Sequence, residues 1–331
     1  MTLSEKEIIS LIREENQTLS GDLLVGIGDD CAVIRRGEGL VEVVTTDTLT
    51  EKVHFDLDWH DPRYLGRKSA AVNLSDVAAM GARPRFALLS IGLPSGLPDG
   101  WLNGFLIGFM EILTEHNTDL IGGDTVASGG GLVISVTVIG EVDEDKLLLR
   151  SGARTGDLVM VSGPLGNGAA GLDICRRNKD GWAGDQWPNL VQAHLDPTPE
   201  IVLGELLAGS GLVTAMMDLS DGLASDLAHL CEESRVGAEV DALSIPMTGG
   251  LRAAAEALTR DPLDWALTGG EDYKLLCTVP PDDEAALQQT VRNVLGRELY
   301  QVGRIVDGSG VLLVDGDERR EISYKGYDHF S

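Results

Sequence analysis

The sequence predicts an α/β or α+β protein with two domains. Strand-like runs rich in β-branched residues alternate with helix-like segments, without a long series of hairpins. The chain has 331 residues, which is enough for two domains, and its 43% hydrophobic content allows sizeable cores. A change of composition follows the charged segment at 143–146 and leads into Arg150. We therefore expect an N-terminal domain over residues 1–148 and a C-terminal domain over 149–331.

The elements of the first half follow from start and stop signals. Ser4-Glu-Lys-Glu7 is a capping box and predicts a helix over 4–15. Asp61-Pro62 predicts the start of a long helix that Gly81 ends. A further helix is expected over 99–116. Strands are expected at 40–46, ending in Thr45-Thr46-Asp47, at 86–93, at 119–125, ending in Gly122-Gly123-Asp124, and at 132–142.

The second half opens with a strand from residue 157. Gly166-Asn-Gly168-Ala-Ala-Gly171 then matches GxGxxG, but the acid that a dinucleotide site needs after a second strand is missing. We interpret it as a tight strand–helix turn, with a nearby phosphate left open. A helix is expected from His194 to about Ala208, and the turn at 268–272 leads into another strand.

The charge limits the partners. The sequence has 26 Lys and Arg against 53 Asp and Glu, a net charge of −27. Such a surface argues against binding nucleic acid or an anionic membrane, and an anionic substrate would need bound cations to approach. The four cysteines form no CxxC pair and indicate reduced thiols. The N-terminus lacks the apolar core of a signal peptide, and no apolar run reaches the ~18 residues of a membrane-spanning helix. We expect a cytoplasmic protein.

An abrupt change from apolar to acidic residues marks the most informative stretch. The apolar run at 211–217 ends at Asp218, and a helical pattern begins at Leu223. One acid suffices to cap a helix, whereas Asp218, Ser220 and Asp221 oversupply it. Closely spaced carboxylates repel each other unless a cation lies between them. From this stretch alone, a capping role and a metal site are equally supported.

Asp76 lies in the middle of a helix that is almost wholly small or apolar. The positions one turn away are Val72, Asn73, Ala79 and Met80, so no cation is supplied by the helix itself. A buried, unpaired carboxylate is costly, so it must be protonated, paired or bound to a metal. We favour a functional role over a satisfied core acid.

Three further acids, Asp30, Asp47 and Asp124, share this setting beside Gly or Thr, although a solvated turn explains each one alone. Oxygen ligands without His or Cys select Mg²⁺ or Mn²⁺ over zinc. Mg²⁺ commonly lies between carboxylates and substrate phosphates, which predicts phosphoryl transfer by positioning and charge neutralisation.

Seven motifs, in order along residues 26–330, closely resemble the thiamine-monophosphate kinase family. Some are shared with the wider superfamily of aminoimidazole ribonucleotide synthetase and selenophosphate synthetase. They are Gly26-Ile-Gly-Asp-Asp-Cys-Ala, Thr45-Thr-Asp-Thr-Leu, Ala71-Val-Asn-Leu-Ser-Asp-Val-Ala-Ala-Met-Gly-Ala, Ile121-Gly-Gly-Asp-Thr, Asp218-Leu-Ser-Asp-Gly-Leu, Gly269-Gly-Glu-Asp-Tyr and Lys325-Gly-Tyr-Asp-His-Phe.

The resemblance implies direct, in-line transfer of the ATP γ-phosphoryl group to thiamine monophosphate, giving thiamine diphosphate, without a covalent enzyme nucleophile. It also implies a homodimer whose N-terminal sheets form a barrel, and a sandwich-like C-terminal domain. Several Mg²⁺ ions would be held by Asp30, Thr45, Thr46, Asp47, Asp76, Asp124, Asp218 and Asp221. ATP would meet Gly123, Asp124, Arg150 and Ser220, and thiamine monophosphate would meet His54, Glu271 and Tyr327.

Other interpretations remain open from the residues alone. His54 fits a core histidine, Arg150 a surface ion pair and Tyr327 simple packing, while His60 is expected at the surface. A sister reaction that activates an amide or selenide, a binding protein for metals or thiamine phosphate, and an acidic structural protein are the alternative functions.

Overall fold

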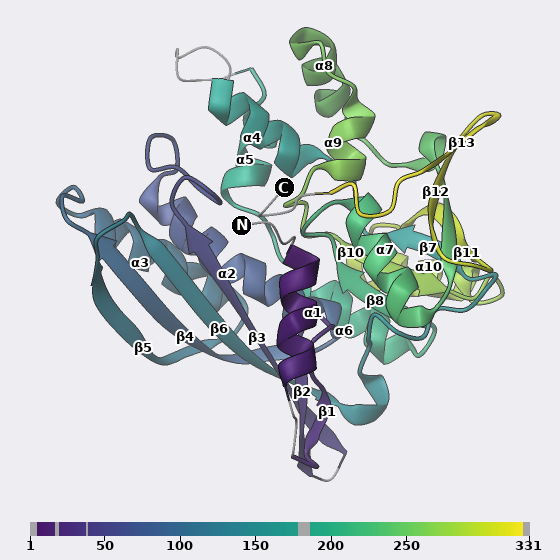
Figure 1. Cartoon of the computed structure of the whole chain (residues 1–331), viewed down its shortest axis with the longest axis horizontal. Helices are drawn as coiled ribbons and strands as arrows, with labels where there is room; N and C mark the ends of the chain where they lie inside the picture. The colour runs from purple at the N-terminus through teal and green to yellow at the C-terminus, as the bar shows by residue number, and fades with distance from the viewer. Residues whose placement is uncertain (1–4, 17–19, 38, 178–185, 327–331) are drawn as a thin grey trace.

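A computed structural model describes residues 5–16, 20–37, 39–177 and 186–326, which form two halves, each with its own sheet (Figure 1). Its helices are α1 (Glu5–Glu15), α2 (Pro62–Ala79), α3 (Trp101–Glu115), α4 (Asn167–Arg177), α5 (Pro188–Leu195), α6 (Ile201–Ser210), α7 (Leu223–Ser234), α8 (Gly249–Leu258), α9 (Pro262–Thr268) and α10 (Glu284–Leu295). Its strands are β1 (Leu23–Val25), β2 (Ala32–Gly37), β3 (Leu40–Thr50), β4 (Arg83–Pro94), β5 (Asp119–Ser128), β6 (Val133–Asp143), β7 (Leu158–Val161), β8 (Ala215–Asp218), β9 (Gly237–Asp241), β10 (Leu275–Val279), β11 (Tyr300–Val306), β12 (Gly310–Asp315) and β13 (Glu318–Glu321).

The first sheet has the order β1-β2-β3-β6-β4-β5. Its strands pair antiparallel except β4 and β5, which are parallel. Within the described chain this sheet is open, with β1 and β5 at its edges, and it does not close into a barrel by itself. The mixed α/β architecture is as predicted, whereas the dimeric barrel stays a prediction.

Two strands of this sheet run further than the sequence suggested. β3 continues to Thr50 because its pairing with β6 continues, and β5 continues to Ser128 along β4. The expectation that Asp47 and Asp124 end their strands is therefore wrong. Both lie inside strands, where the hydrogen-bonded ladder rather than the first acid decides how far the strand extends.

Helix α2 is the central helix of the molecule and lies between the first sheet and the second half (Figure 1). Asp61 caps it by accepting a hydrogen bond from the Arg63 N–H, and Gly81 follows its end in the left-handed region at φ 67°. The expected helix is confirmed. A Cβ on Gly204 of α6 would lie 2.2 Å from the Ala78 carbonyl oxygen, so the two helices touch backbone to backbone.

The two halves share one hydrophobic core. A continuous cluster of buried residues includes Leu74 of α2, Leu203 of α6 and Met216 of β8. This packing fixes Asp76 of α2 against the end of β8. The sheets themselves lie within residues 23–143 and 158–321, and the boundary at 148/149 stays a prediction.

The second sheet has the order β13-β12-β9-β11-β7-β10-β8 and is antiparallel except for the β9–β12 pair. The GxGxxG segment begins at Gly166, directly before α4, and its other residues form the first turns of that helix. Two of its backbone N–H groups have an internal partner. Asp272 accepts hydrogen bonds from Gly166 N–H at 2.6 Å and from Gly168 N–H at 3.2 Å. Because a carboxylate of the protein holds this helix N-terminus, the turn is structural and is not a phosphate cradle.

Two local predictions are wrong. The helix expected over 194–208 is split, since Pro197 and Pro199 interrupt it between α5 and α6. His60 is buried, with 2% of its surface exposed, and its Nε2 lies 3.1 Å from the Leu195 carbonyl oxygen.

The four cysteines are buried and free, as expected. Among the described helices, none has the length and apolarity needed to cross a bilayer.

Candidate functional site

Three carboxylates from distant parts of the sequence meet at the junction of the two halves. Asp30 precedes β2, Asp76 lies in α2, and Asp218 ends β8. One oxygen of each lies within 4.8 Å of the others. Asp30 and Asp218 are buried and Asp76 is half-buried. The sequence prediction that these acids converge is thus met for this trio.

Each carboxylate of this trio has its own support. The Thr45 hydroxyl donates to Asp76 Oδ2 at 2.5 Å, and the Ser75 hydroxyl donates to Asp218 Oδ2 at 2.5 Å. The Arg150 guanidinium binds one oxygen of Asp30, with Nε at 3.1 Å. The other, Oδ2, is buried without a hydrogen-bond partner among the described residues.

Burial and mutual repulsion disfavour the charged forms of these acids. Burial and the neighbouring Asp30 raise the pKa of Asp218 to about 8. Burial, together with Asp47 and Asp218, raises the pKa of Asp76 well above its usual range. Burial and then the charge of Asp30 raise the pKa of Asp29 to about 7. A divalent cation among them would favour ionisation again.

The donor set fits a hard cation. The trio offers carboxylate oxygens, and Thr45 adds a hydroxyl beside them, so Mg²⁺ or Mn²⁺ is the appropriate class of ion. The unpartnered Asp30 Oδ2 is a ligand atom that the fold leaves for such an ion. Asp47 joins this group electrostatically, because burial and then the charge of Asp30 raise its pKa to about 6. Its N–H donates to Asn73 Oδ1 at 2.9 Å.

A cavity of about 640 Å³ opens beside the trio. Its volume suits a substrate-sized ligand. Asp30, Thr45 and Asp218 do not line it. Seven of the predicted site residues lie on its wall, namely Thr46, Asp47, His54, Asp76, Ser220, Asp221 and Glu271.

The structure does not bring Gly123 and Asp124 to this cavity within one chain. Asp124 is exposed on the edge strand β5. Across the sheet, Asp47 pairs with Val136, Val136 with Leu89, and Leu89 with Gly123, the neighbour of Asp124. Three strand spacings, about 14 Å, therefore separate the strand position of Asp124 from that of Asp47. Arg150 likewise is not on the cavity wall, and Tyr327 lies outside the described residues.

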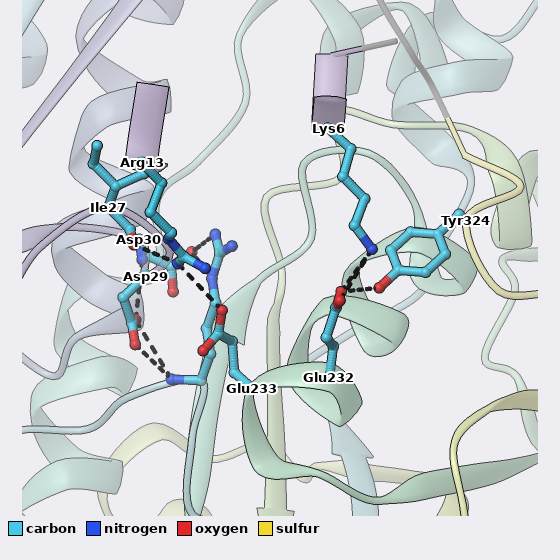
Figure 2. Close-up of polar contacts among 9 residues, drawn as sticks. Lys6, Arg13, Ile27, Asp29, Asp30, Glu232, Glu233 and Tyr324 are labelled. Atoms are coloured by element: carbon cyan, nitrogen blue, oxygen red, sulfur yellow. Dashed lines mark hydrogen bonds and ion pairs between the residues drawn. The ribbon is translucent and has the colours of Figure 1, made fainter. Parts of the chain in front are cut away.

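The loop that carries Asp30 is held by Arg13 of α1, as Figure 2 shows, and also by Arg150. Arg13 Nε donates to the Ile27 carbonyl oxygen at 2.9 Å, and the Arg150 N–H donates to Asp29 at 3.1 Å. Gly28 has φ +127°, and a Cβ there would lie 1.6 Å from Arg13 Nη2. The left-handed backbone at this position favours glycine, whereas the half-exposed Arg13 side chain could move aside for a larger residue.

A second set of contacts attaches α1 to α7 (Figure 2). Lys6 Nζ lies 2.8 Å from Glu232, which also accepts a hydrogen bond from the Tyr324 hydroxyl. Arg13 Nη2 lies 3.4 Å from Glu233. None of the described α1 residues is buried, so polar contacts rather than apolar burial hold the helix there.

Several supporting residues were missed by the sequence reasoning. Asn73 and Ser75 are polar side chains inside an apolar helix, a signal that could have marked them as partners of the acids. Asp29 was passed over beside Asp30. Asp226 accepts hydrogen bonds from the N–H groups of Asp221 and Gly222, both at 3.1 Å, and so fills the capping role at the start of α7.

Comparison with known proteins identifies the class first. Residues 28–142 match the AIR synthase related protein N-terminal domain, and residues 154–315 match its C-terminal domain. Hydrogenase maturation protein HypE in complex with ATP has the same fold, with a TM-score of 0.69 at 20% identity over 94% of this chain and 88% of that one. The chain is thus a two-domain protein of the AIR synthase related class.

Relatives within that class narrow the identification. The chain is 37% identical to thiamine-monophosphate kinase of Haemophilus influenzae, over 100% of this chain and 99% of the relative. It is 36% identical to the Escherichia coli K12 enzyme of that name, with the same coverage. The solved structure of AaThiL complexed with AMPPCP and TMP has a TM-score of 0.86 at 32% identity, over 100% and 99% of the two chains. The chain belongs to the thiamine-monophosphate kinase family, a family of phosphate-transferring enzymes.

Proposed function

We propose that the chain transfers the γ-phosphoryl group of ATP directly to thiamine monophosphate, in line, to give thiamine diphosphate. The observation that carries this proposal is the carboxylate trio beside a cavity of about 640 Å³. AaThiL has been solved with both AMPPCP and TMP, which supports one site for both ligands. The free cysteines fit the expected cytoplasmic location.

In this proposal the acids hold several Mg²⁺ ions, which supply charge neutralisation for the polyphosphate. The residues that would hold them are Asp30, Thr45, Thr46, Asp47, Asp76, Asp218 and Asp221, with Asp124 from a second copy. Ser220, Gly123 and Arg150 are proposed contacts of ATP. The chain itself positions the two substrates and excludes water, and no side chain is required to form a covalent bond.

On the substrate side, we propose that Glu271 receives the cationic thiazolium ring, because a carboxylate on a cavity wall favours a cation. His54 borders the same cavity and is suited to an anionic phosphate. Its Nδ1 accepts a hydrogen bond from the Thr50 N–H at 3.0 Å, which leaves Nε2 as the protonated nitrogen of the neutral ring. Tyr327 stays a predicted third contact.

A homodimer is the second part of the proposal. The edge strand β5 exposes Ile121 and Val126, at 55% and 54%, and an unpaired apolar edge favours pairing with another strand. Asp124 lies on that same strand, so pairing there would bring it toward the site of a second copy.

The test is ADP release measured with and without thiamine monophosphate, with thiamine diphosphate identified as the product. Release that depends on thiamine monophosphate and Mg²⁺ supports the kinase. Binding of both ligands without turnover would indicate a binding protein, and release that depends on an amide or selenide acceptor would indicate a sister reaction of the class.

A further inference from the structure

Behind Glu271 lies a pair of buried side chains that the cavity does not reach. Lys68 Nζ lies 2.7 Å from Glu271 Oε1, and His194 Nδ1 lies 2.7 Å from Oε2 as a close polar contact without hydrogen-bond geometry. The Lys68 side chain has 0% exposure and that of His194 has 1%. Lys68 Nζ also donates to the His194 carbonyl oxygen at 3.1 Å. Glu271 lines the cavity, whereas Lys68 and His194 do not.

The backbone reinforces this arrangement. Glu271 has φ 66°, in the left-handed region that a side chain such as glutamate rarely adopts. Its N–H donates to the Ser220 carbonyl oxygen at 2.7 Å, which ties the turn to the segment that follows β8. A glutamate in the left-handed region and a completely buried ammonium group are both costly, and the two meet at this one carboxylate.

We infer that Lys68 and His194 are positioning residues, which hold the Glu271 carboxylate ionised and oriented at the cavity wall for the cationic ring of the substrate. The inference rests on the proposed function, since it assigns a role in binding that substrate. Lys68 acts from α2 and His194 from α5, so two elements from different halves fix a residue on a third segment.

The surrounding charges agree with this role. Burial would raise the pKa of Glu271, but the charge of Lys68 and the contact with His194 outweigh it, so that the pKa is held below its usual range. Burial and then Lys68 lower the pKa of His194, so this ring is neutral near pH 7. His60, whose ring centre is 6.1 Å from that of His194, is neutral for the same reasons.

Two further groups complete the surroundings of the carboxylate. Tyr273 is buried on the same turn, and burial followed by the charge of Glu271 raises its pKa well above its usual value, so it stays neutral. Arg176 of α4 lies on the cavity wall and reaches His194 only through its charge. Lys68 is therefore the cation that directly contacts Glu271 among the described residues.

The experiment compares Lys68→Met with Arg67→Met in steady-state assays of the full chain. Arg67 is the neighbouring residue of α2 and pairs with Glu115 and Asp196, away from the cavity. For Lys68→Met we expect KM for thiamine monophosphate to rise about tenfold, as for loss of a charge-assisted contact. KM for ATP and kcat at saturation should stay at the wild-type level, and Arg67→Met should change neither KM.

A double-mutant cycle then separates positioning from general packing. In a Glu271→Gln background, adding Lys68→Met should raise KM for thiamine monophosphate no further, because the group through which Lys68 acts is already gone. A further rise of equal size, or a fall in kcat with unchanged KM, would overturn the inference. If Lys68→Met does not fold, His194→Leu removes only one contact and should raise the same KM severalfold.

The outcomes also separate the inference from the function on which it rests. A wild-type protein without ADP release that depends on thiamine monophosphate would refute the proposed function. An active wild-type protein whose Lys68→Met and His194→Leu variants keep the wild-type KM for thiamine monophosphate would refute only the positioning role.

Discussion

Arg150 and Asp30 form an ion pair in which the carboxylate side chain is completely buried and the guanidinium is one-fifth exposed. Burial opposes the charge of Arg150, but the pairing with Asp30 outweighs it and raises the pKa of Arg150 above its usual range. The arginine that the family resemblance assigns to ATP therefore also balances the charge of a proposed metal ligand.

Replacing Arg150 by methionine should lower the free energy of unfolding by about 3 kcal/mol, because it leaves a buried carboxylate without its partner. Chemical denaturation in the absence of divalent ions measures this. The double variant Arg150→Met/Asp30→Asn should recover most of the loss, since the uncompensated charge is removed too. A double variant as unstable as the single one would show that Arg150 acts through packing instead.

Asp76→Asn should reduce Mg²⁺-dependent turnover of ATP and thiamine monophosphate by at least about 100-fold, because it removes a charged oxygen at the centre of the trio. The fold should persist, since the amide keeps the volume of the carboxylate and repulsion from Asp218 falls. Asp315→Asn, an exposed acid at the end of β12, is the control that should keep full activity. Full activity of Asp76→Asn would remove the central residue of the proposed site.

The stability of the metal-free protein should fall as the pH rises from about 7 to about 8, the upper part of the range between the unfolded and folded pKa values of Asp218. The pKa of Asp218 is raised by burial to about 8, so the folded state binds this proton more tightly than the unfolded chain does. Stability from such a group is fully present below the unfolded pKa of about 4 and is lost progressively as the pH rises to the folded pKa. The buried histidines do not contribute here, because their lowered pKa leaves them neutral in both states above pH 7.

Thermal unfolding at several pH values, with EDTA or with excess Mg²⁺, tests this dependence. Added Mg²⁺ should raise the melting temperature more at pH 9 than at pH 7, since the ion replaces the protons that the acids have lost. Asp218→Asn should reduce both the pH dependence and the Mg²⁺ effect. An equal Mg²⁺ effect at both pH values would contradict the assignment of these acids as ligands.

The sequence was sufficient where local chemistry decides the structure. Asp61-Pro62 and Gly81 set the ends of α2, and the change from apolar to acidic residues at Asp218 marks the end of β8. Asp76 stood out because a lone acid in an apolar helix needs a partner. The fold supplies the Thr45 hydroxyl as a hydrogen-bond donor and places the carboxylates of Asp47 and Asp218 nearby, whose charges disfavour ionisation of Asp76.

What the sequence could not give depends on contacts between distant segments. The length of β3 and β5 follows from pairing with β6 and β4, so the acids within them could not be placed at strand ends or inside from local signals. His60 was misassigned because its burial comes from packing against α5. Lys68 and Glu271 are 203 positions apart, and nothing local to either residue indicates their ion pair.

The separation of Asp124 from Asp47 leads to a final prediction about shared sites. If each site combines the acids of one chain with Asp124 of a second copy, Asp76→Asn and Asp124→Asn should each be inactive alone. Refolding the two variants together in equal amounts should restore activity. Random pairing makes half of the dimers mixed, and one of the two sites in each mixed dimer is intact, so about a quarter of the wild-type activity should return.

Mixing Asp76→Asn with Asp218→Asn should restore none, because both changes lie in the same chain's trio and every mixed site lacks one of its acids. A protein that sediments as a monomer under assay conditions, or an Asp124→Asn variant with full activity, would exclude the shared site.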